Sequence, residues 1–181
     1  MLSIKTDIPD VLVIEPRVFE DERGFFFESW SAASWREITG LETTFVQDNH
    51  SRSICGVVRG LHYQVNHVQG KLVRVISGEI YDVAVDLRRS SSTFGHWVGE
   101  RLSAENRRQL WIPAGFAHAF MALTETADVL YKATDIYDRE SERSIRWDDE
   151  TLAIDWPSPA ASVLSEKDQR GVAFVDAETF E

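Results

Sequence analysis

Short apolar runs separated by turn-forming residues recur along most of this 181-residue chain. Many short strands at such a spacing are typical of an all-β sandwich or barrel. The chain contains no internal repeat, low-complexity tract or Pro/Ser-rich linker, so residues 1–181 are predicted to form a single domain. The predicted strands are Val11–Ile14, Phe25–Phe27, Phe45–Val46, Val57–Val58, Leu72–Ile76, Ile80–Leu87, Leu110–Ile112, Phe120–Leu123 and Val129–Tyr131.

One pair of these runs has the pattern of a β-hairpin. Ser77 and Gly78 separate the run Lys71–Ile76 from the run Glu79–Leu87. Glycine allows the positive φ that a two-residue turn needs, so we expect the two runs to pair with each other. Within the second run the residue type alternates, which predicts one face in the core and one largely polar face; the two sets are Tyr81, Val83, Val85, Leu87 and Asp82, Ala84, Asp86.

One short helix is predicted outside the strands, from Ser31 to about Thr39. Ser31 can serve as the N-cap and Gly40 as the left-handed C-terminal stop. Trp35 is expected to pack this helix on the barrel. From about Asp138 onward, the chain mixes charged residues with Trp147, Ile154 and Trp156-Pro157, and we expect wrapping loops and short helices.

The formal net charge of −11 argues against a nucleic-acid partner, which would need a basic surface. No run of about 18 apolar residues is present, so no membrane span is expected. The N-terminus also lacks the basic head and apolar stretch of a secretory signal. Cys55 is the only cysteine, which excludes an intrachain disulfide and fits a cytoplasmic protein. We expect its thiol to be buried and unreactive.

Ionisable side chains lie within two of the predicted strands. Arg59 and His62 occur in the segment Val57–Gln64, and Lys71 begins a later apolar run. Charges in such positions are costly unless they are paired or used. Gly60 allows a β-bulge that would turn Arg59 and His62 toward one cavity. A neutral imidazole can accept a proton while nearby cations hold an anion, so we predict proton chemistry on a negatively charged substrate.

Three further residues are candidates for the same site. His118 follows a turn-like segment, which would place it at the mouth of a barrel, although a lone histidine, like His50 or His67, is more often a hydrogen-bonded structural residue. Tyr131 is either a core tyrosine or a proton donor to a carbanion. Asp168 lies in a charged segment typical of a solvated loop, but a carboxylate on the far nitrogen of a catalytic imidazole would raise its basicity.

A metal site is not expected. Gln64 occupies the position where a metal-dependent cupin usually has the second histidine of His-x-His, and no glutamate follows at ligand spacing. Only His62 and His118 remain as plausible ligands, whereas a protein zinc or iron site normally needs three.

Six blocks of residues, in order over nearly the whole chain, together resemble the dTDP-4-dehydrorhamnose 3,5-epimerases, which are metal-independent cupins. A single Gly-Leu-His would be a weak match, but six ordered blocks are specific. The blocks are Asp21–Glu28, Gln47–Asn49, Arg59–Gln64 with Gln69–Val75, Pro113–Phe120, Tyr131–Lys132 through Tyr137, and Leu164–Asp168.

The resemblance implies a cupin-type jelly-roll barrel with a few short peripheral helices. It also implies a homodimer that acts, without a cofactor, on dTDP-4-dehydro-6-deoxyglucose. Carried over by position, His62 would be the general base with Asp168 as its partner, Tyr131 the acid on the opposite face, and Lys71 a neighbour of the enolate oxygen. Arg23 and Arg59 resemble diphosphate contacts and Tyr137 the residue that stacks on thymine. Further substrate-binding positions would be Glu28, Gln47, Asn49, His118, Glu142 and Lys167.

The chemistry is consistent with these roles, and several alternatives remain open. Carbons 3 and 5 of the sugar flank a ketone, so enolate resonance acidifies their protons, and no net oxidation occurs. A 3-epimerase or a 3,4-ketoisomerase would use nearly the same base. A non-catalytic sugar-nucleotide-binding cupin and a metal-dependent cupin enzyme are the other classes. If His62 must be neutral, activity should fall below about pH 6.5.

Overall fold

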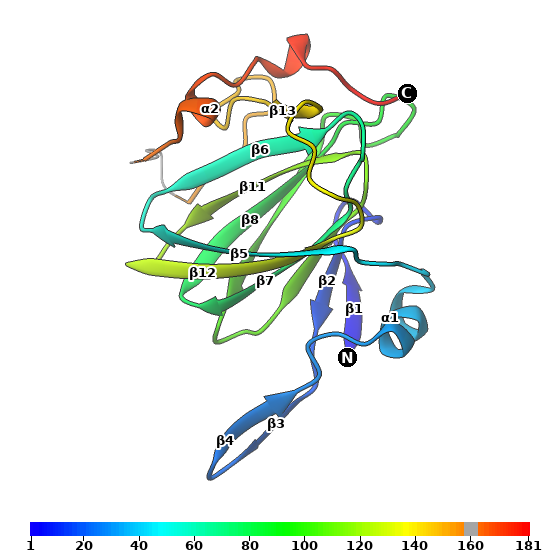
Figure 1. The fold of residues 1–181 in the computed structure, drawn as a ribbon, viewed down its shortest axis with the longest axis vertical. Coiled ribbons are helices and arrows are strands. Elements are labelled where there is room, and N and C mark those ends of the chain that lie inside the picture. The colour runs from blue at the N-terminus through cyan, green and yellow to red at the C-terminus, as the bar shows by residue number, and fades with distance from the viewer. Residues whose placement is uncertain (158–162) are drawn as a thin grey trace.

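The computed structural model describes residues 1–157 and 163–181, and it contains two antiparallel sheets that face each other. The first sheet has the order β1 (Leu2–Lys5), β2 (Leu12–Glu15), β10 (Gln109–Ile112), β7 (Lys71–Ser77), β12 (Thr126–Ala133) and β5 (Gln47–Ile54). The second has the order β13 (Glu142–Ser144), β6 (Val58–Gln64), β11 (Phe116–Ala122), β8 (Glu79–Asp86) and β9 (Trp97–Ser103) (Figure 1). The predicted all-β jelly-roll fold is confirmed.

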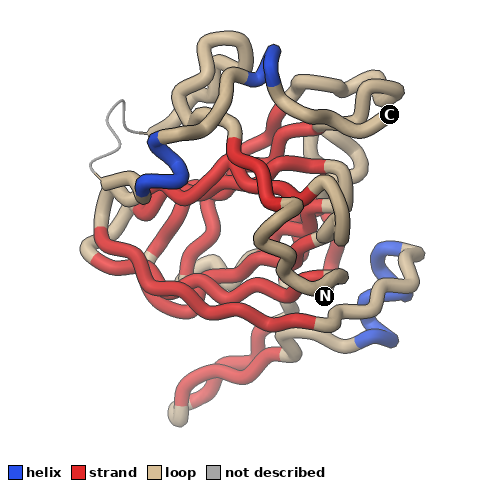
Figure 2. Tube along the Cα trace, turned by 45° about the horizontal axis from the view of Figure 1, so that its top comes forward, coloured by secondary structure: helices blue, strands red, loops and turns tan. Residues whose placement is uncertain are grey.

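The remaining elements lie around these sheets. Strands β3 (Val18–Asp21) and β4 (Gly24–Phe27) form a separate hairpin. The helices are α1 (Ala32–Thr39), α2 (Glu166–Gln169) and the 3-10 helix η1 (Phe174–Asp176). The strands of the two sheets curve around a common centre, and the hairpin projects from the side opposite to α2 (Figure 2).

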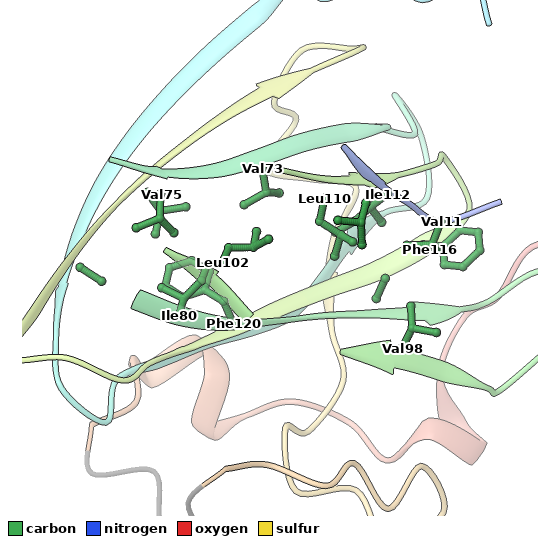
Figure 3. Close-up of a cluster of buried hydrophobic side chains, with 14 of the residues drawn as sticks. Val11, Val73, Val75, Ile80, Val98, Leu102, Leu110, Ile112, Phe116 and Phe120 are labelled. Atoms are coloured by element: carbon green, nitrogen blue, oxygen red, sulfur yellow. The ribbon is translucent and has the colours of Figure 1, made fainter. Parts of the chain in front are cut away.

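The interior of the barrel is filled by alternate residues of both sheets. Val73, Val75 and Leu110 from the first sheet meet Ile80 and Phe120 from the second (Figure 3). Alternation with a period of two points every second side chain of a strand inward, so residues in register with these also face the interior. Lys71 and Tyr131 keep that register, two residues from Val73 and Val129 respectively.

The predicted hairpin between Lys71–Ile76 and Glu79–Leu87 is wrong. Strand β7 pairs with β10 and β12, whereas β8 pairs with β11 and β9 in the other sheet. Gly78, with φ of +75°, turns the chain from one sheet to the other. A Cβ there would lie 2.1 Å from the carbonyl oxygen of Thr126, so the turn requires glycine for space as well as for φ.

The prediction that one face of β8 is solvated is also wrong, because both faces are buried. Asp82 and Asp86 are fully buried on the inner face. The outer face packs under the C-terminal segment, in a cluster that includes Val83, Val85, Leu152 and Phe174. The predicted wrapping of the tail is confirmed, and it is this wrapping that buries the second face.

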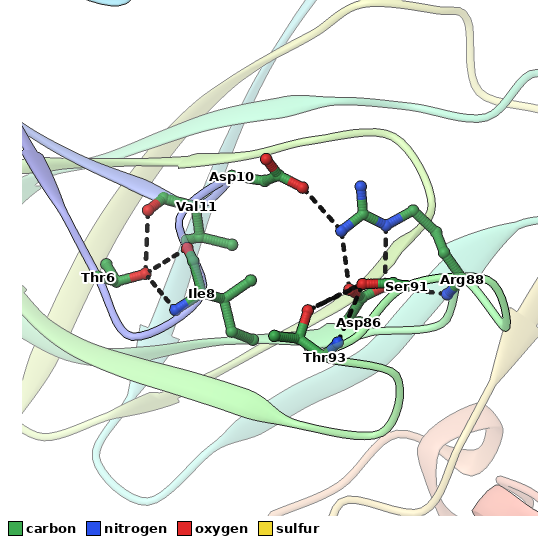
Figure 4. Close-up of polar contacts among 8 residues, drawn as sticks. All are labelled: Thr6, Ile8, Asp10, Val11, Asp86, Arg88, Ser91 and Thr93. Atoms are coloured by element: carbon green, nitrogen blue, oxygen red, sulfur yellow. Dashed lines mark hydrogen bonds and ion pairs between the residues drawn. The ribbon is translucent and has the colours of Figure 1, made fainter.

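The buried carboxylate of Asp86 ties β8 to the loop that follows β1 (Figure 4). It accepts hydrogen bonds from Arg88, Ser91 and Thr93, and Arg88 also pairs with Asp10 at 2.9 Å. Burial alone would raise the pKa of Asp86, but these bonds outweigh it and lower the pKa to about 2. The network therefore stabilises the fold in its ionised form.

The predicted helix is confirmed as α1, with Ser31 as its N-cap and Gly40 in the left-handed region. Trp35 is buried and packs against Trp111 of the first sheet, with ring centroids 5.2 Å apart. Phe45, predicted as part of a strand, instead lies in the segment between α1 and β5, where its ring packs against Trp35, and β5 begins at residue 47.

Cys55 departs from the prediction, because its side chain is exposed just beyond the end of β5. Its Sγ lies 3.7 Å from the carbonyl oxygen of Leu123. The neighbouring Ile54 is also exposed, so the apolar run there did not indicate burial. No helix of the described residues is long and apolar enough to cross a membrane.

Candidate active site

A cavity of about 600 Å³ opens between the two sheets. Nine of the sequence-predicted site residues line it: Arg59, His62, Lys71, His118, Tyr131, Tyr137, Glu142, Lys167 and Asp168. They come from both sheets and from the C-terminal segment around α2. Of the other histidines, His50 pairs with Asp128 and His67 with Asp135, outside the cavity.

A bulge in β6 places His62 in this cavity. His62 lies opposite His118 of β11, but Arg59 lies opposite Phe120, so β6 contains one more residue than its partner in this interval. Gly60, with φ of +122°, lies within the bulge, and a Cβ there would be 2.4 Å from the carbonyl oxygen of His118. The predicted bulge is confirmed, and both Arg59 and His62 face the cavity.

His62 and Asp168 form a hydrogen-bonded pair, with Nε2 and Oδ1 2.5 Å apart. Asp168 is 3% exposed, and its second oxygen accepts a hydrogen bond from the Ser165 hydroxyl at 2.6 Å. Ser165 is also the N-cap of α2, so one residue fixes both the helix start and the carboxylate. The two residues are 106 positions apart in the sequence, and their spacing gave no indication that they would meet in the fold.

Electrostatics keep this imidazole neutral and this carboxylate ionised. Burial lowers the pKa of His62, with the ammonium groups of Lys167 and Lys71 adding to the shift, and the Asp168 bond only partly opposes it. The pKa of Asp168 is lowered as well, since the bonds from His62 and Ser165 outweigh its burial. A neutral imidazole oriented by a carboxylate can act as a general base.

Lys71 and Tyr131 face His62 from the other sheet. Lys71 begins β7 and Tyr131 lies on the adjacent β12. Burial lowers the pKa of Lys71 to about 8, although the carboxylates of Asp82 and Glu142 oppose the shift. Burial raises the pKa of Tyr131, aided by the charge of Glu142, so the phenol holds its proton at neutral pH.

A second buried pair, His118 and Asp82, lies beside the first. His118 is 7% exposed and lies within β11, so it is inside the barrel rather than at its mouth as predicted. Its Nε2 is 2.7 Å from Asp82 Oδ1, while Asp82 Oδ2 is buried with no hydrogen-bond partner among the described residues. Asp82 was missed from the sequence because its strand face was taken as solvated.

Two polar clusters flank the rim of the cavity. Lys167 donates to Glu142 at 2.7 Å and the Tyr137 hydroxyl donates to the other Glu142 oxygen at 3.0 Å. Burial raises the pKa of Glu142, but the Lys167 pairing outweighs it and the net shift is downward. On the other side, Arg59 Nε donates to Ser53 Oγ at 2.9 Å, which leaves the guanidinium fixed in direction.

Four predicted substrate-binding residues do not line the cavity. Gln47 and Asn49 lie close to it on β5, because Asn49 is the cross-strand partner of Tyr131 and Gln47 accepts from the backbone N–H of Tyr137. Arg23 lies at the tip of the β3–β4 hairpin, where its side chain is 85% exposed.

Glu28 lies beyond the hairpin and accepts a hydrogen bond from Ser34 of α1. Conversely, Ser51 was not predicted but lines the cavity, and its hydroxyl is buried without a partner in the described residues. Its signal was its position on the same strand face as Gln47 and Asn49, which lie four and two residues before it.

The arrangement supports proton removal and delivery at one small molecule from two directions. His62 comes from one sheet and Tyr131 from the other. In the lining the cations Arg59, Lys71 and Lys167 outnumber the carboxylates Glu142 and Asp168, within a chain of net charge −11. Within residues 1–157 and 163–181, no three His, Cys, Asp or Glu side chains are grouped in the way a metal ion requires.

Comparisons with known proteins agree with this chemistry. The family model for dTDP-4-dehydrorhamnose 3,5-epimerase matches residues 5–176. A protein of that name from Pseudomonas aeruginosa is 61% identical over 180 residues, which cover 99% of each chain. The crystal structure of a 3,5-epimerase from Legionella pneumophila in complex with dTDP-4-keto-L-rhamnose is 52% identical, with a TM-score of 0.94 over 97% of this chain and 94% of that one.

A related structure differs in its stated activity. A 3'-monoepimerase from Streptomyces bikiniensis, crystallised with dTDP-quinovose, is 30% identical to this chain. Its TM-score is 0.88 over 94% of this chain and 87% of its own. The same fold therefore occurs in proteins described as epimerising one carbon or two.

Proposed function

Because the chain belongs to the dTDP-4-dehydrorhamnose 3,5-epimerase family, we propose that it epimerises dTDP-4-dehydro-6-deoxyglucose at carbons 3 and 5, giving dTDP-4-dehydro-L-rhamnose. The observation that carries the proposal is the placement of His62 and Tyr131 on opposite sheets, facing one cavity. Inversion needs a base on one face of the sugar ring and an acid on the other. A cavity of about 600 Å³ also falls in the range of small-molecule sites.

In this proposal His62 removes the proton and Asp168 holds its ring. Asp168 accepts the N–H of Nε2, so Nδ1 is the nitrogen left to take the substrate proton. The positive charge that then develops on the ring lies against a buried carboxylate, which stabilises it. Tyr131 delivers a proton to the opposite face and is reprotonated from solvent.

Lys71 stabilises the enolate oxygen that forms when the proton leaves. Protons next to a ketone are weakly acidic, and imidazole alone would be a poor base for them. One well-placed donor in a water-poor site contributes about 3 kcal/mol to the transition state. With a pKa of about 8, most of the Lys71 amine is protonated at neutral pH, and its N–H groups are more acidic and therefore stronger hydrogen-bond donors than those of an ordinary lysine.

The remaining lining residues bind the nucleotide-sugar. Arg59 is a fixed guanidinium suited to the diphosphate. Lys167, Glu142, His118, Gln47 and Asn49 supply polar contacts around the sugar and base. Tyr137 is half-exposed at the rim, where an aromatic face can stack on thymine.

Arg23 and Glu28 lead us to propose a homodimer as well. The hairpin that carries Arg23 projects away from the barrel (Figure 1), and it exposes the large apolar side chains of Phe19, Phe25 and Phe26. Exposed apolar groups of this size indicate an interface. If Arg23 is a diphosphate contact, it reaches that ligand in the cavity of a second copy.

The reaction is tested by incubating the protein with dTDP-4-dehydro-6-deoxyglucose in deuterated water and locating the label by NMR. We expect deuterium at both carbons 3 and 5, and no turnover for His62→Asn with dTDP binding retained. Label confined to carbon 3 would instead support the single-site epimerase, the activity named for the Streptomyces relative. Turnover unchanged in His62→Asn would remove His62 from the base role.

A further inference from the structure

Arg107 connects the barrel to the projecting β3–β4 hairpin. Its Nη1 lies 3.0 Å from Glu20 Oε1, and its guanidinium carbon lies 4.4 Å from the centre of the Phe25 ring. Glu20 and Phe25 are cross-strand partners on β3 and β4. One arginine therefore contacts both strands of the hairpin at a single cross-strand pair, next to the turn that contains Arg23.

The loop that presents Arg107, between β9 and β10, is held in one conformation. The side-chain oxygen of Asn106 accepts from the backbone N–H groups of Ser103 and Arg108, each at 3.0 Å. Arg107 itself has φ of +56°, an uncommon conformation for a residue with a Cβ. The side chain thus extends toward the β3–β4 hairpin from a hydrogen-bonded turn.

The neighbouring Arg108 provides a contrast within the same loop. Its guanidinium pairs with Glu100 at 3.0 Å and with Glu15 at 3.6 Å, both on barrel strands. Arg107 is the more buried of the two, with 20% of its side chain exposed against 37% for Arg108. The Nε atom of Arg107 is buried with no hydrogen-bond partner among the described residues. Hydrogen bonding of the guanidinium therefore does not by itself account for the burial of this side chain.

We propose that Arg107 is a positioning residue for the partner subunit's substrate site: it sets the direction of the β3–β4 hairpin and so places Arg23 against the diphosphate bound by the second copy. This rests on the proposed function and homodimer. A two-stranded ribbon is only marginally stable alone, so its angle needs an anchor. Arg107 lies outside the cavity lining, and its loss should weaken substrate binding without changing the chemical step.

The first test compares two alanine variants of the same loop. Removing a partly buried ion pair and a cation–π contact should raise the KM of Arg107→Ala for the dTDP-sugar about tenfold, with kcat unchanged. Arg107→Lys keeps the charge but not the planar group, so an intermediate KM is expected. Arg108→Ala, the matched control, should keep the native KM. Equal effects of Arg107→Ala and Arg108→Ala, or a loss confined to kcat, would overturn the proposal.

The second test separates action on the partner from action within one chain. Chains with different affinity tags are co-expressed and the mixed dimer is purified through both tags. With Arg107→Ala on one chain and His62→Asn on the other, the working cavity receives the intact hairpin, and its KM should be native. With both substitutions on one chain and a native partner, the working cavity receives the loosened hairpin, and its KM should stay raised. The reverse pattern refutes the inference.

A parallel pair of mixed dimers with Arg23→Ala in place of Arg107→Ala tests the premise on its own. If the Arg23 dimers show no dependence on which chain carries the substitution, the homodimer proposal fails. If the KM of the Arg23 dimers depends on which chain carries the substitution but that of the Arg107 dimers does not, only the proposed role of Arg107 is refuted. Absence of deuterium exchange by the native protein would instead reject the proposed function.

Discussion

Replacing Lys71 by methionine should stabilise the protein while destroying its activity. The pKa of Lys71 is lowered from 10.5 to about 8 because its ammonium is buried. Each pKa unit corresponds to about 1.36 kcal/mol, so keeping Lys71 charged in the folded state costs about 3 kcal/mol of folding free energy. Partial access of solvent to the amine would reduce this cost to about 2 kcal/mol. Methionine is similarly long and unbranched, so it should fill the same space without that cost.

The pH dependence of this gain follows from proton linkage. Between about pH 8 and 10.5 the unfolded chain binds more protons at Lys71 than the folded one, so native stability rises with pH in that window. The variant has no such group. Its advantage should therefore be about 2–3 kcal/mol at pH 7 and disappear by about pH 10.5.

Urea unfolding of both proteins at pH 7 and pH 10 measures the difference, and deuterium exchange into the substrate measures the lost turnover. Lys132→Met is the control, since the Lys132 amine pairs with Asp48 outside the cavity and its loss should bring no gain. A Lys71→Met protein that is less stable than the native one at pH 7, or a gain that does not vary with pH, would refute the burial argument.

Three further outcomes are expected. The acid limb of the kcat/KM profile should have its midpoint below the reference imidazole value of 6.5, because burial lowers the pKa of His62. The alkaline limb should have its midpoint near pH 8, where Lys71 loses its proton, and Lys71→Arg should move only this second midpoint to higher pH. Asp168→Asn should lower kcat on the order of 10³-fold with little change in KM, since the imidazole loses its orienting carboxylate; stopped-flow or NMR turnover checks this. Asp86→Asn should lose about 2 kcal/mol of stability at pH 7, a difference that closes as pH falls from 3.8 through about 2, as urea titrations at several pH values would show.

Local sequence patterns correctly predicted the elements whose backbone conformation is set by residues within or next to them. Ser31 and Gly40 fixed the ends of α1 because capping is a local interaction. Gly60 predicted the bulge in β6 for a similar reason. The polar strand β5, which contains Gln47 and Asn49, was missed because it lies at a sheet edge and lacks an apolar run.

Pairing between distant segments was beyond the reach of these patterns. Ser77 and Gly78 had the pattern of a hairpin turn, yet this turn connects two different sheets. Strands β7 and β8 each pair with strands from distant parts of the chain, and the turn residues do not determine those pairings. The contact of His62 with Asp168 depends on how the C-terminal segment crosses the barrel, and no spacing in the sequence encodes that path. The resemblance to a family supplied the pair, and the geometry explains it.

The location of the site also explains why the protein covers the outer faces of its sheets. Lys71, His62 and Asp82 occupy barrel positions that apolar side chains would otherwise fill, and Asp168 of the C-terminal segment is buried beside His62. Buried ionisable groups of this kind cost stability. The interior apolar cluster is therefore limited to part of the barrel. Two further clusters lie outside it, one under the C-terminal segment and one under α1 around Trp35 and Trp111. Burial on these outer faces offsets the cost within. In the proposed mechanism the wrapping tail therefore acts both through Asp168 and through the stability that a polar cavity requires.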